Sequence, residues 1–325
     1  MSQLRDNILA WSASGRLKPV DAPRALAIAD LTPTLSDWRN FLSRLLLWIG
    51  IVLVASSAIF FFAYNWQSLH RFGKFGLAEI ILAAAVIAAW QFGIERPAGK
   101  AALLGAGLMT GALLALLGQT YQTGADTFEL FAFWAILILP WVIAARFVPL
   151  WLMWIGLLNL SVSMYFQARA WGMLRVLFGE SGMMWGLFGL NIVALAVWEL
   201  GLVREISWLN RWGARVLATL AGGFATIIGI LAVMNSPQMG AWAILAYFAW
   251  MLAMYANYRL REIDVFMLAG MVLSAVVVTA AFLSQHLLFD GRDATGGFLL
   301  IGLVIIGLSG AGAWWIRQML REQAQ

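Results

Sequence analysis

Very few charged residues fall inside the long apolar stretches of this sequence, and one of them, Glu79, is the first candidate for chemistry. It lies about one helical turn inside an apolar stretch that begins near residue 75. A carboxylate inside a membrane is costly, so by default it indicates a functional site. One turn is only about 5 Å of depth, so the simpler alternative is a side chain that reaches the headgroups or pairs with Arg71 or Lys74.

Other polar residues gather where apolar stretches end on the side of the membrane that we expect to face outward. The connection 119–127 holds no Lys or Arg, so this face is locally acidic and rich in amides. Such a surface could bind a cation, a sugar or a lipid headgroup, although loops are also polar simply because they touch water. The predicted polar pocket consists of Tyr64, Asn65, Trp66, Glu79, Gln119, Tyr121 and Asp126. Nearby polar residues on the same face are His70, Gln122, Glu129, His286, Asp290 and Asp293.

Catalytic and cofactor motifs are absent from the sequence. His70 and His286 are the only histidines, there is no cysteine, and no His and carboxylate pair has metal-ligand spacing. Nucleophile-elbow, phosphate-loop and dinucleotide fingerprints are also missing. We therefore predict no catalytic residue, no metal site and no cofactor. A membrane-embedded enzyme stays an alternative, with Glu79, Asp126 or a histidine as general base.

The composition indicates that lipid is the main solvent of this chain. Hydrophobic residues make up 62% of it and charged residues 11%, with a mean hydropathy of +0.83, whereas soluble domains carry about 25% charged residues. The pI near 9.9 could indicate nucleic-acid binding, but the basic residues are scattered over short loops, so we expect no nucleic-acid partner. The sequence predicts an all-α polytopic membrane bundle.

Ten apolar stretches are long enough to be transmembrane helices. The first, residues 45–63, runs for 19 residues without a charge, close to the roughly 20 needed to cross a bilayer. Pro140 is the only proline inside a stretch, so the fourth helix could kink there. The ten stretches are 45–63, 75–93, 101–118, 128–145, 148–166, 182–200, 214–234, 240–257, 264–284 and 297–316.

Residues 1–40 precede the membrane and are predicted to form a cytosolic helical hairpin, separate from a transmembrane bundle at 41–325. One short helix is expected at 2–12 and a second at 21–29, with a break at Gly15. Helices this short are marginal alone, so the hairpin should pack on the bundle or on a partner. It contains no secretory signal of the usual form, so the first membrane helix should direct insertion.

The distribution of Lys and Arg predicts the orientation, since cytoplasmic loops carry the excess. With ten helices and a cytoplasmic N-terminus, both termini are cytoplasmic, and 16 of the 21 Lys and Arg residues fall on that side. The five on the outer side are Arg71, Lys74, Arg169, Arg175 and Arg292. With one helix fewer, every later loop would lie on the opposite side of the membrane and the excess of Lys and Arg on one side would be lost. The same asymmetry therefore supports the number of helices.

Two connections and two glycine pairs suggest further structure. Aromatic residues in 171–178 and 208–212 suit interfacial helices, although ordinary aromatic belts would show the same pattern. Gly107 with Gly111, and Gly182 with Gly186, are spaced for close helix approach. We favour internal packing over a dimer seam for these pairs, because a chain with 31 glycines produces such spacings by chance.

The N-terminal half also carries familiar motifs: Trp11, Gly15 and Leu17 in the hairpin, the segment Ala63-Tyr64-Asn65-Trp66, and Gly118-Gln119-Thr120-Tyr121. Over roughly the first 150 residues the chain resembles a bacterial membrane-protein family catalogued as domain of unknown function 2157. The resemblance implies a bacterial inner-membrane protein and brings no activity with it. It draws attention to polar residues that the predicted topology independently places at one membrane face.

Three functions follow as hypotheses. The first is a non-enzymatic bundle whose outward-facing polar pocket, between the first four helices, binds or transports a small solute or lipid headgroup. Five plus five helices would suit an inverted repeat, but the halves share no evident similarity and few charges lie at mid-membrane. The second is a scaffold or assembly subunit that binds another membrane protein or a second copy of itself. The third is a membrane-embedded enzyme that acts on a lipid or cell-envelope substrate.

Overall fold

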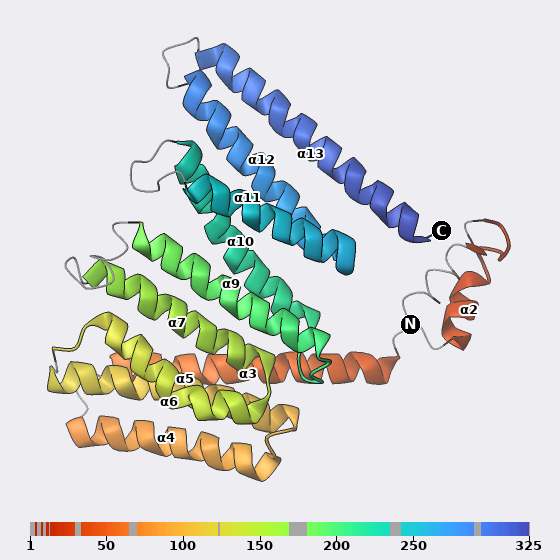
Figure 1. Cartoon of the computed structure of the whole chain (residues 1–325). Coiled ribbons are helices and arrows are strands. Elements are labelled where there is room, and N and C mark those ends of the chain that lie inside the picture. The colour runs from red at the N-terminus through yellow and green to blue at the C-terminus, as the bar shows by residue number, and fades with distance from the viewer. Residues whose placement is uncertain are drawn as a thin grey trace. The chain divides into compact units, whose positions relative to one another are not determined.

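The computed structural model describes residues 4, 8, 11–12, 14–29, 34–64, 70–122, 124–168, 181–234, 242–288 and 294–324. These residues form helices joined by turns, with no strand among them (Figure 1). Nine of the described helices are long and apolar enough to cross a membrane. The prediction of an all-α membrane bundle is confirmed.

The helices divide into two compact units, Met1–Met109 and Thr110–Gln325. The first contains α2 (Ala22–Ile28), α3 (Leu35–Tyr64), α4 (Arg71–Phe92) and the beginning of α5 (Pro97–Tyr121). The predicted division is a different one, because it separates residues 1–40, expected in the cytosol, from residues 41–325, expected in the membrane. It stays a prediction.

The N-terminal segment of the first unit turns where the sequence predicts. Gly15 has a φ of +72°, which glycine adopts without steric cost, and the Leu17 N–H donates to the Trp11 carbonyl at 3.0 Å. α2 then begins with Ala22 and Pro23. Proline suits the first turn of a helix because the N–H that it lacks would have no partner within the helix there. The break and the second short helix are therefore as expected. Most residues of the first short helix lie outside the described part.

The second unit contains the remaining helices, packed largely in sequence order. They are α6 (Thr127–Ala145), α7 (Val148–Ala168), α9 (Gly182–Val203), α10 (Arg211–Val233), α11 (Trp242–Tyr255), the π-helix η1 (Ala256–Arg261), α12 (Val265–Leu288) and α13 (Ala294–Ala324). α10 packs against α7, α9, α11 and α12, and Figure 1 shows it running between α9 and α12. It is therefore the central helix of this unit.

Small residues explain the central place of α10. Ala214, Ala218, Ala221 and Ala225 recur every three or four residues and are almost completely buried, so they form one stripe on which neighbouring helices pack closely. Gly229 continues the stripe, since a Cβ there would lie 2.9 Å from Cδ2 of Tyr247 in α11. This close packing fixes where α11 and α12 leave space between them.

Two amide side chains, one of them buried, join α7 to α9 inside the same unit. Asn191, which is completely buried, donates to Oδ1 of Asn159 at 2.6 Å and to the Leu187 carbonyl at 2.8 Å. Asn159 donates in return to Asn191 at 3.3 Å and to the Ile155 carbonyl at 2.9 Å. Polar pairs of this kind hold membrane helices together because hydrocarbon offers no other partner.

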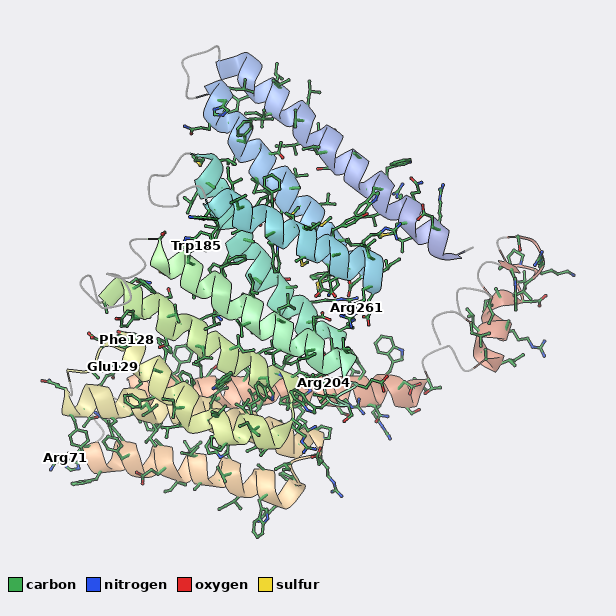
Figure 2. The ribbon with its side chains drawn as sticks, viewed as in Figure 1. Arg71, Phe128, Glu129, Trp185, Arg204 and Arg261 are labelled. Atoms are coloured by element: carbon green, nitrogen blue, oxygen red, sulfur yellow. The ribbon has the colours of Figure 1, made fainter. Side chains whose placement is uncertain are left out.

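Each of the ten predicted stretches coincides with one described helix, from α3 to α13. The 240–257 stretch is not a single α-helix: α11 spans only 14 residues, and the chain then continues as the π-helix η1. The described helices of the second unit alternate in direction. Figure 2 shows Arg204 and Arg261 at one end of this unit and Phe128, Glu129 and Trp185 at the other. This alternation is what the predicted order of loops requires.

Three smaller expectations have different outcomes. The segment 208–212 is not an interfacial helix, because Trp208 lies in a turn and Trp212 belongs to α10; the 171–178 segment lies outside the described residues. Pro140 lies inside α6, which continues to Ala145. Glycine pairing serves internal packing at two positions: a Cβ on Gly111 would overlap the Trp134 ring, and one on Gly186 would touch Val162 of α7.

Candidate functional site

The residues of the predicted polar pocket lie at or near helix ends. Tyr64 ends α3, Glu79 lies in α4, and both are exposed. Gln119 and Tyr121 lie in the last turn of α5 and are exposed as well. Asn65 and Trp66 fall outside the described residues.

Asp126, the last member of this set, has a structural role. It is the N-cap of α6 and forms a capping box with Glu129, whose carboxylate accepts a hydrogen bond from the Asp126 N–H at 3.3 Å. Tyr64 and Glu79 belong to the first unit, whereas Gln119, Tyr121 and Asp126 belong to the second. Whether they converge stays a prediction.

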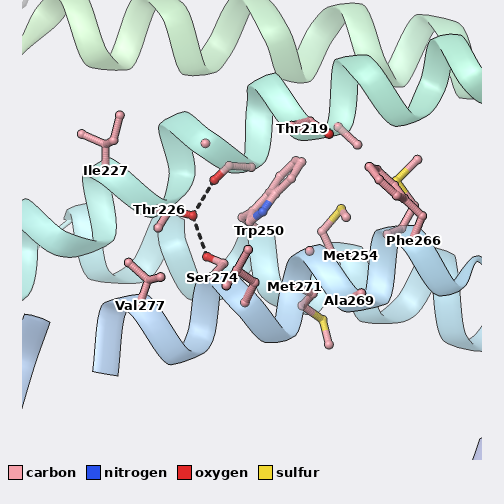
Figure 3. Close-up of a pocket in the computed structure, with 16 residues that line it drawn as sticks. Thr219, Thr226, Ile227, Trp250, Met254, Phe266, Ala269, Met271, Ser274 and Val277 are labelled. Carbon is pink, nitrogen blue, oxygen red and sulfur yellow. Dashed lines mark hydrogen bonds between the residues drawn. The ribbon is translucent and has the colours of Figure 1, made fainter. Parts of the chain in front are cut away.

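A cavity of about 640 Å³ lies elsewhere, between α10, α11 and α12 of the second unit (Figure 3). We call it the main cavity. Its size falls within the 300–1,000 Å³ of ordinary ligand sites. Small residues on the facing helices create the space, namely Ala218, Gly222 and Gly223 of α10 with Ala269 and Gly270 of α12.

Trp250 and Met254 of α11 form one wall of the main cavity. The Trp250 side chain is only 7% exposed, and a Cβ on Gly222 would lie 3.6 Å from its Cζ2 atom. On its other side the ring meets Phe188 of α9 edge to face, with centroids 6.0 Å apart. This indole is therefore fixed by packing on both sides.

Three hydroxyl groups meet beside the main cavity, and we call them the hydroxyl cluster; two of them, those of Thr226 and Ser274, belong to residues that line it. Thr226 of α10 donates to the Gly222 carbonyl at 2.6 Å, and its Oγ1 lies 2.7 Å from Oγ of Ser274 in α12, as the dashed lines in Figure 3 mark. The Tyr247 hydroxyl of α11 lies 3.2 Å from the same Ser274 oxygen. The cluster thus links all three helices that surround the cavity.

The hydroxyl cluster lies deep in the helix bundle. Ser274 is nine residues after the first residue of α12, or about 14 Å along the helix axis, near the middle of a hydrocarbon layer about 30 Å thick. None of the residues that line the cavity is ionisable. The site can therefore bind the apolar part of a ligand and form hydrogen bonds with a neutral polar group on it, but it offers no charge.

A second cavity of about 500 Å³ lies between α9 and α11, and we call it the side cavity. Trp250 and Met254 line both cavities, so α11 separates them. Its walls are apolar except for Glu199, Asn257 and Tyr258, which lie near the end of α9 and in η1. Tyr258 is buried and lies within the π-helical turn, and such turns often occur at functional sites.

An ion-pair network surrounds Glu199 at this end. Its carboxylate accepts a hydrogen bond from the Tyr258 hydroxyl at 2.7 Å, and both oxygens lie 3.1 Å from Nη1 of Arg211. Arg211 also pairs with Glu262 through Nη2. The network joins the end of α9, the beginning of α10 and the residues around η1, so it fixes these ends relative to one another.

A separate ion pair lies beside the main cavity. Nε of Arg215 donates to Oδ2 of Asp264 at 3.1 Å, and its guanidinium lies over the Phe266 ring at 5.7 Å. Oδ1 of Asp264 accepts the Phe266 N–H at 3.0 Å and thereby caps α12. Because Phe266 lines the cavity, this pair marks the end of the cavity that lies nearest to the membrane surface.

No sequence pattern singles out the residues that line the two cavities. Thr226, Tyr247, Trp250 and Ser274 are uncharged and lie inside apolar stretches, where such residues are common. The one signal that could have found them is the pairing of small residues at 222–223 with those at 269–270, each within a turn of a hydroxyl. Among the described residues, no group of three or more His, Asp or Glu could hold a metal ion.

Comparison with known proteins places the N-terminal part of this chain. A family model described as a predicted membrane protein, DUF2157, matches residues 9–151. The resemblance indicated by the motifs at 63–66 and 118–121 is confirmed. No curated protein and no solved structure shows a significant match. The chain is thus a multi-span membrane protein, and both cavities lie beyond the matched residues.

Proposed function

We propose that this protein binds a lipid molecule inside the membrane, with the apolar part of the lipid in the main cavity. The observation that carries the proposal is an apolar cavity of about 640 Å³ among three tightly packed helices, with only a few polar groups in its wall. A rigid apolar site with a few convergent polar groups is the general form of a ligand pocket.

The extent of the main cavity supports a chain that lies along the helices. From Phe266 to Val277 its α12 wall covers eleven residue steps, which correspond to about 17 Å. This is about half of a hydrocarbon layer 30 Å thick. The Arg215 and Asp264 ion pair lies just beyond one end. The cavity thus matches the length of one leaflet.

The orientation that we propose is an inner-membrane protein with both termini in the cytoplasm. The excess of Lys and Arg on one side supports it, and so does the alternating direction of the helices in the second unit (Figure 2). In this orientation the main cavity occupies the cytoplasmic half of the bilayer. The ion-pair network of Arg211 and Glu199 then lies at the cytoplasmic surface.

The outward-facing polar pocket of the sequence analysis is the rival location for a ligand, a small solute or a lipid headgroup. Glu79 and Gln119 are exposed, which is compatible with a ligand at the outer face but does not demand one. A scaffold that binds a membrane-protein partner or a second copy, and an enzyme, are further alternatives. One experiment separates the two ligand sites, because each can be altered without changing the other.

The experiment is native mass spectrometry of the full chain released from its own membrane. Gly270→Leu fills the main cavity, since a Cβ there meets nothing within 4 Å. Gly310→Leu is the matched control, because Gly310 of α13 is equally open but lines neither cavity. We expect a bound lipid on the wild type and on the Gly310 variant, and its loss on the Gly270 variant.

The opposite results have definite meanings. A bound lipid that survives Gly270→Leu contradicts the proposal. Loss of a bound molecule only in the double variant Glu79→Gln, Gln119→Ala would move the site to the outer face. Retention of another protein by every variant, with no lipid on any of them, would favour the scaffold.

A further inference from the structure

The hydroxyl cluster has a fixed direction of hydrogen bonding. Each hydroxyl carries one proton and two lone pairs, and Thr226 uses its proton on the Gly222 carbonyl at 2.6 Å. Ser274 must therefore be the donor in its 2.7 Å contact with Thr226. Tyr247 must in turn donate to Ser274 at 3.2 Å. All three protons are used inside the protein.

The cluster consequently offers the main cavity acceptors and no donors. Thr226 and Ser274 both line the cavity, and each oxygen keeps one lone pair after the chain of hydrogen bonds is complete. At mid-membrane depth the surrounding hydrocarbon offers no donor to these lone pairs. A ligand that carries an O–H or N–H group gains a hydrogen bond here that the surrounding hydrocarbon cannot supply.

Trp250 adds one donor to the same wall. No acceptor for its Nε1–H is found among the described residues, although the residue is more than nine-tenths buried. Nε1 lies 3.9 Å from a Cβ built on Gly222, whose carbonyl ends the hydroxyl chain. Figure 3 shows the Trp250 ring beside the pair Thr226 and Ser274. Donor and acceptors thus face one region of the cavity.

We propose, building on the proposed function, that the lipid in the main cavity is a neutral alcohol whose hydroxyl binds between Trp250 and the pair Thr226 and Ser274. A hydroxyl accepts from the indole and donates to the cluster at the same time. An ether or an ester could only accept. A bare acyl chain satisfies neither side and leaves the indole N–H, which borders the cavity, without a partner.

Charged lipids are excluded from this position by depth. The cavity is lined by no ionisable residue, and moving a charge to the bilayer centre costs about 3 kcal/mol on the milder scales. A phospholipid could place an acyl chain in the cavity, but its phosphate would stay at the surface, near Arg215. A neutral lipid alcohol can dissolve at mid-membrane and reach the cluster from there.

The test compares an alcohol with its methyl ether, in which a methyl group replaces the hydroxyl hydrogen and so removes the donor. Hexadecan-1-ol and hexadecyl methyl ether are titrated onto the full chain in lipid nanodiscs, and native mass spectrometry measures how much of each binds. Loss of one buried hydrogen bond predicts that the alcohol binds about three- to tenfold more tightly than the ether. The comparison needs no variant, so it stands even if a variant misfolds.

Variants then locate the effect. The double variant Thr226→Val, Ser274→Ala removes the acceptors with little change of volume, and the preference for the alcohol should fall to about one. Thr219→Val is the control, since Thr219 lines the same cavity but its hydroxyl donates to the Arg215 carbonyl at 2.8 Å, away from the cluster. It should keep the preference.

The outcomes separate this inference from the proposed function. Equal binding of alcohol and ether to the wild type, with loss of both in Gly270→Leu, overturns the alcohol and leaves the lipid site intact. A preference that the double variant keeps also overturns the inference. Binding of neither probe, or binding that Gly270→Leu leaves unchanged, overturns both proposals.

Discussion

Replacement of Arg211 by methionine tests whether the ion-pair network holds the ends of the helices beside the side cavity. Met keeps much of the length of the arginine side chain but removes its charge. Among the described residues, Glu199 then retains only the Tyr258 hydroxyl, at 2.7 Å, as a partner. Glu262 loses its pairing with the same guanidinium.

The size of the effect follows from burial. Removing one partner of a fully buried ion pair costs about 3–5 kcal/mol, whereas an exposed pair contributes about 0–1 kcal/mol. The side chains of Arg211 and Glu199 are 31% and 18% exposed, and that of Glu262 is 57% exposed. The network lies between the two limits, and we expect a loss of about 2 kcal/mol in the free energy of unfolding, nearly all of it from Glu199.

The assay is reversible unfolding in mixed micelles by titration with sodium dodecyl sulfate, followed by tryptophan fluorescence. Arg204→Met is the control, because it removes a positive charge from the same end of the bundle at an exposed residue. The double variant Arg211→Met, Glu199→Gln should recover about half of the lost stability, since no unpaired carboxylate remains at position 199. A loss for Arg211→Met no larger than that for Arg204→Met would refute this reasoning.

Three further predictions concern packing and orientation. Gly229→Ala places a Cβ 2.9 Å from Cδ2 of Tyr247; the strain of about 1–3 kcal/mol exceeds the gain of about 1 kcal/mol in helix propensity, so the same assay should show a net loss. Asn191→Leu breaks the hydrogen bonds to α7 and should cost about 1 kcal/mol; an unchanged midpoint would contradict the role of the amide pair. Because the chain has no cysteine, Gln122→Cys should react with an impermeant maleimide from outside intact cells, and Arg261→Cys only after permeabilisation; the reverse pattern would invert the orientation.

The helices could be predicted from the sequence because each depends on a single local property, an apolar stretch long enough to cross the bilayer. Only 240–257 departs in form, since η1 replaces the last turns of α11, and a change from α- to π-helix leaves no mark in hydropathy. The prediction of an interfacial helix at 208–212 is wrong for a similar reason. Its aromatic residues suit an interface, but Trp208 instead stacks on Trp151, with ring centroids 5.7 Å apart.

The candidate site could not be predicted, because it depends on residues far apart in the chain. Thr226 and Ser274 are 48 positions apart, and neither carries a charge that would draw attention. Glu79 did draw attention as a carboxylate in an apolar stretch, yet it is exposed. A search for ionisable residues finds groups that are costly in a membrane, whereas a cavity for a neutral ligand is built from small residues and hydroxyls.

The central claim is that a lipid occupies the main cavity, and photo-crosslinking in the native membrane tests it most directly. Cells are fed a fatty acid that carries a diazirine in its chain, irradiated, and the labelled peptides of the protein are identified. The account predicts labelling concentrated in 218–227 and 266–277, and its loss in Gly270→Leu but not in Gly310→Leu. Labelling spread evenly over lipid-facing helices such as α13, and unchanged by Gly270→Leu, would contradict it.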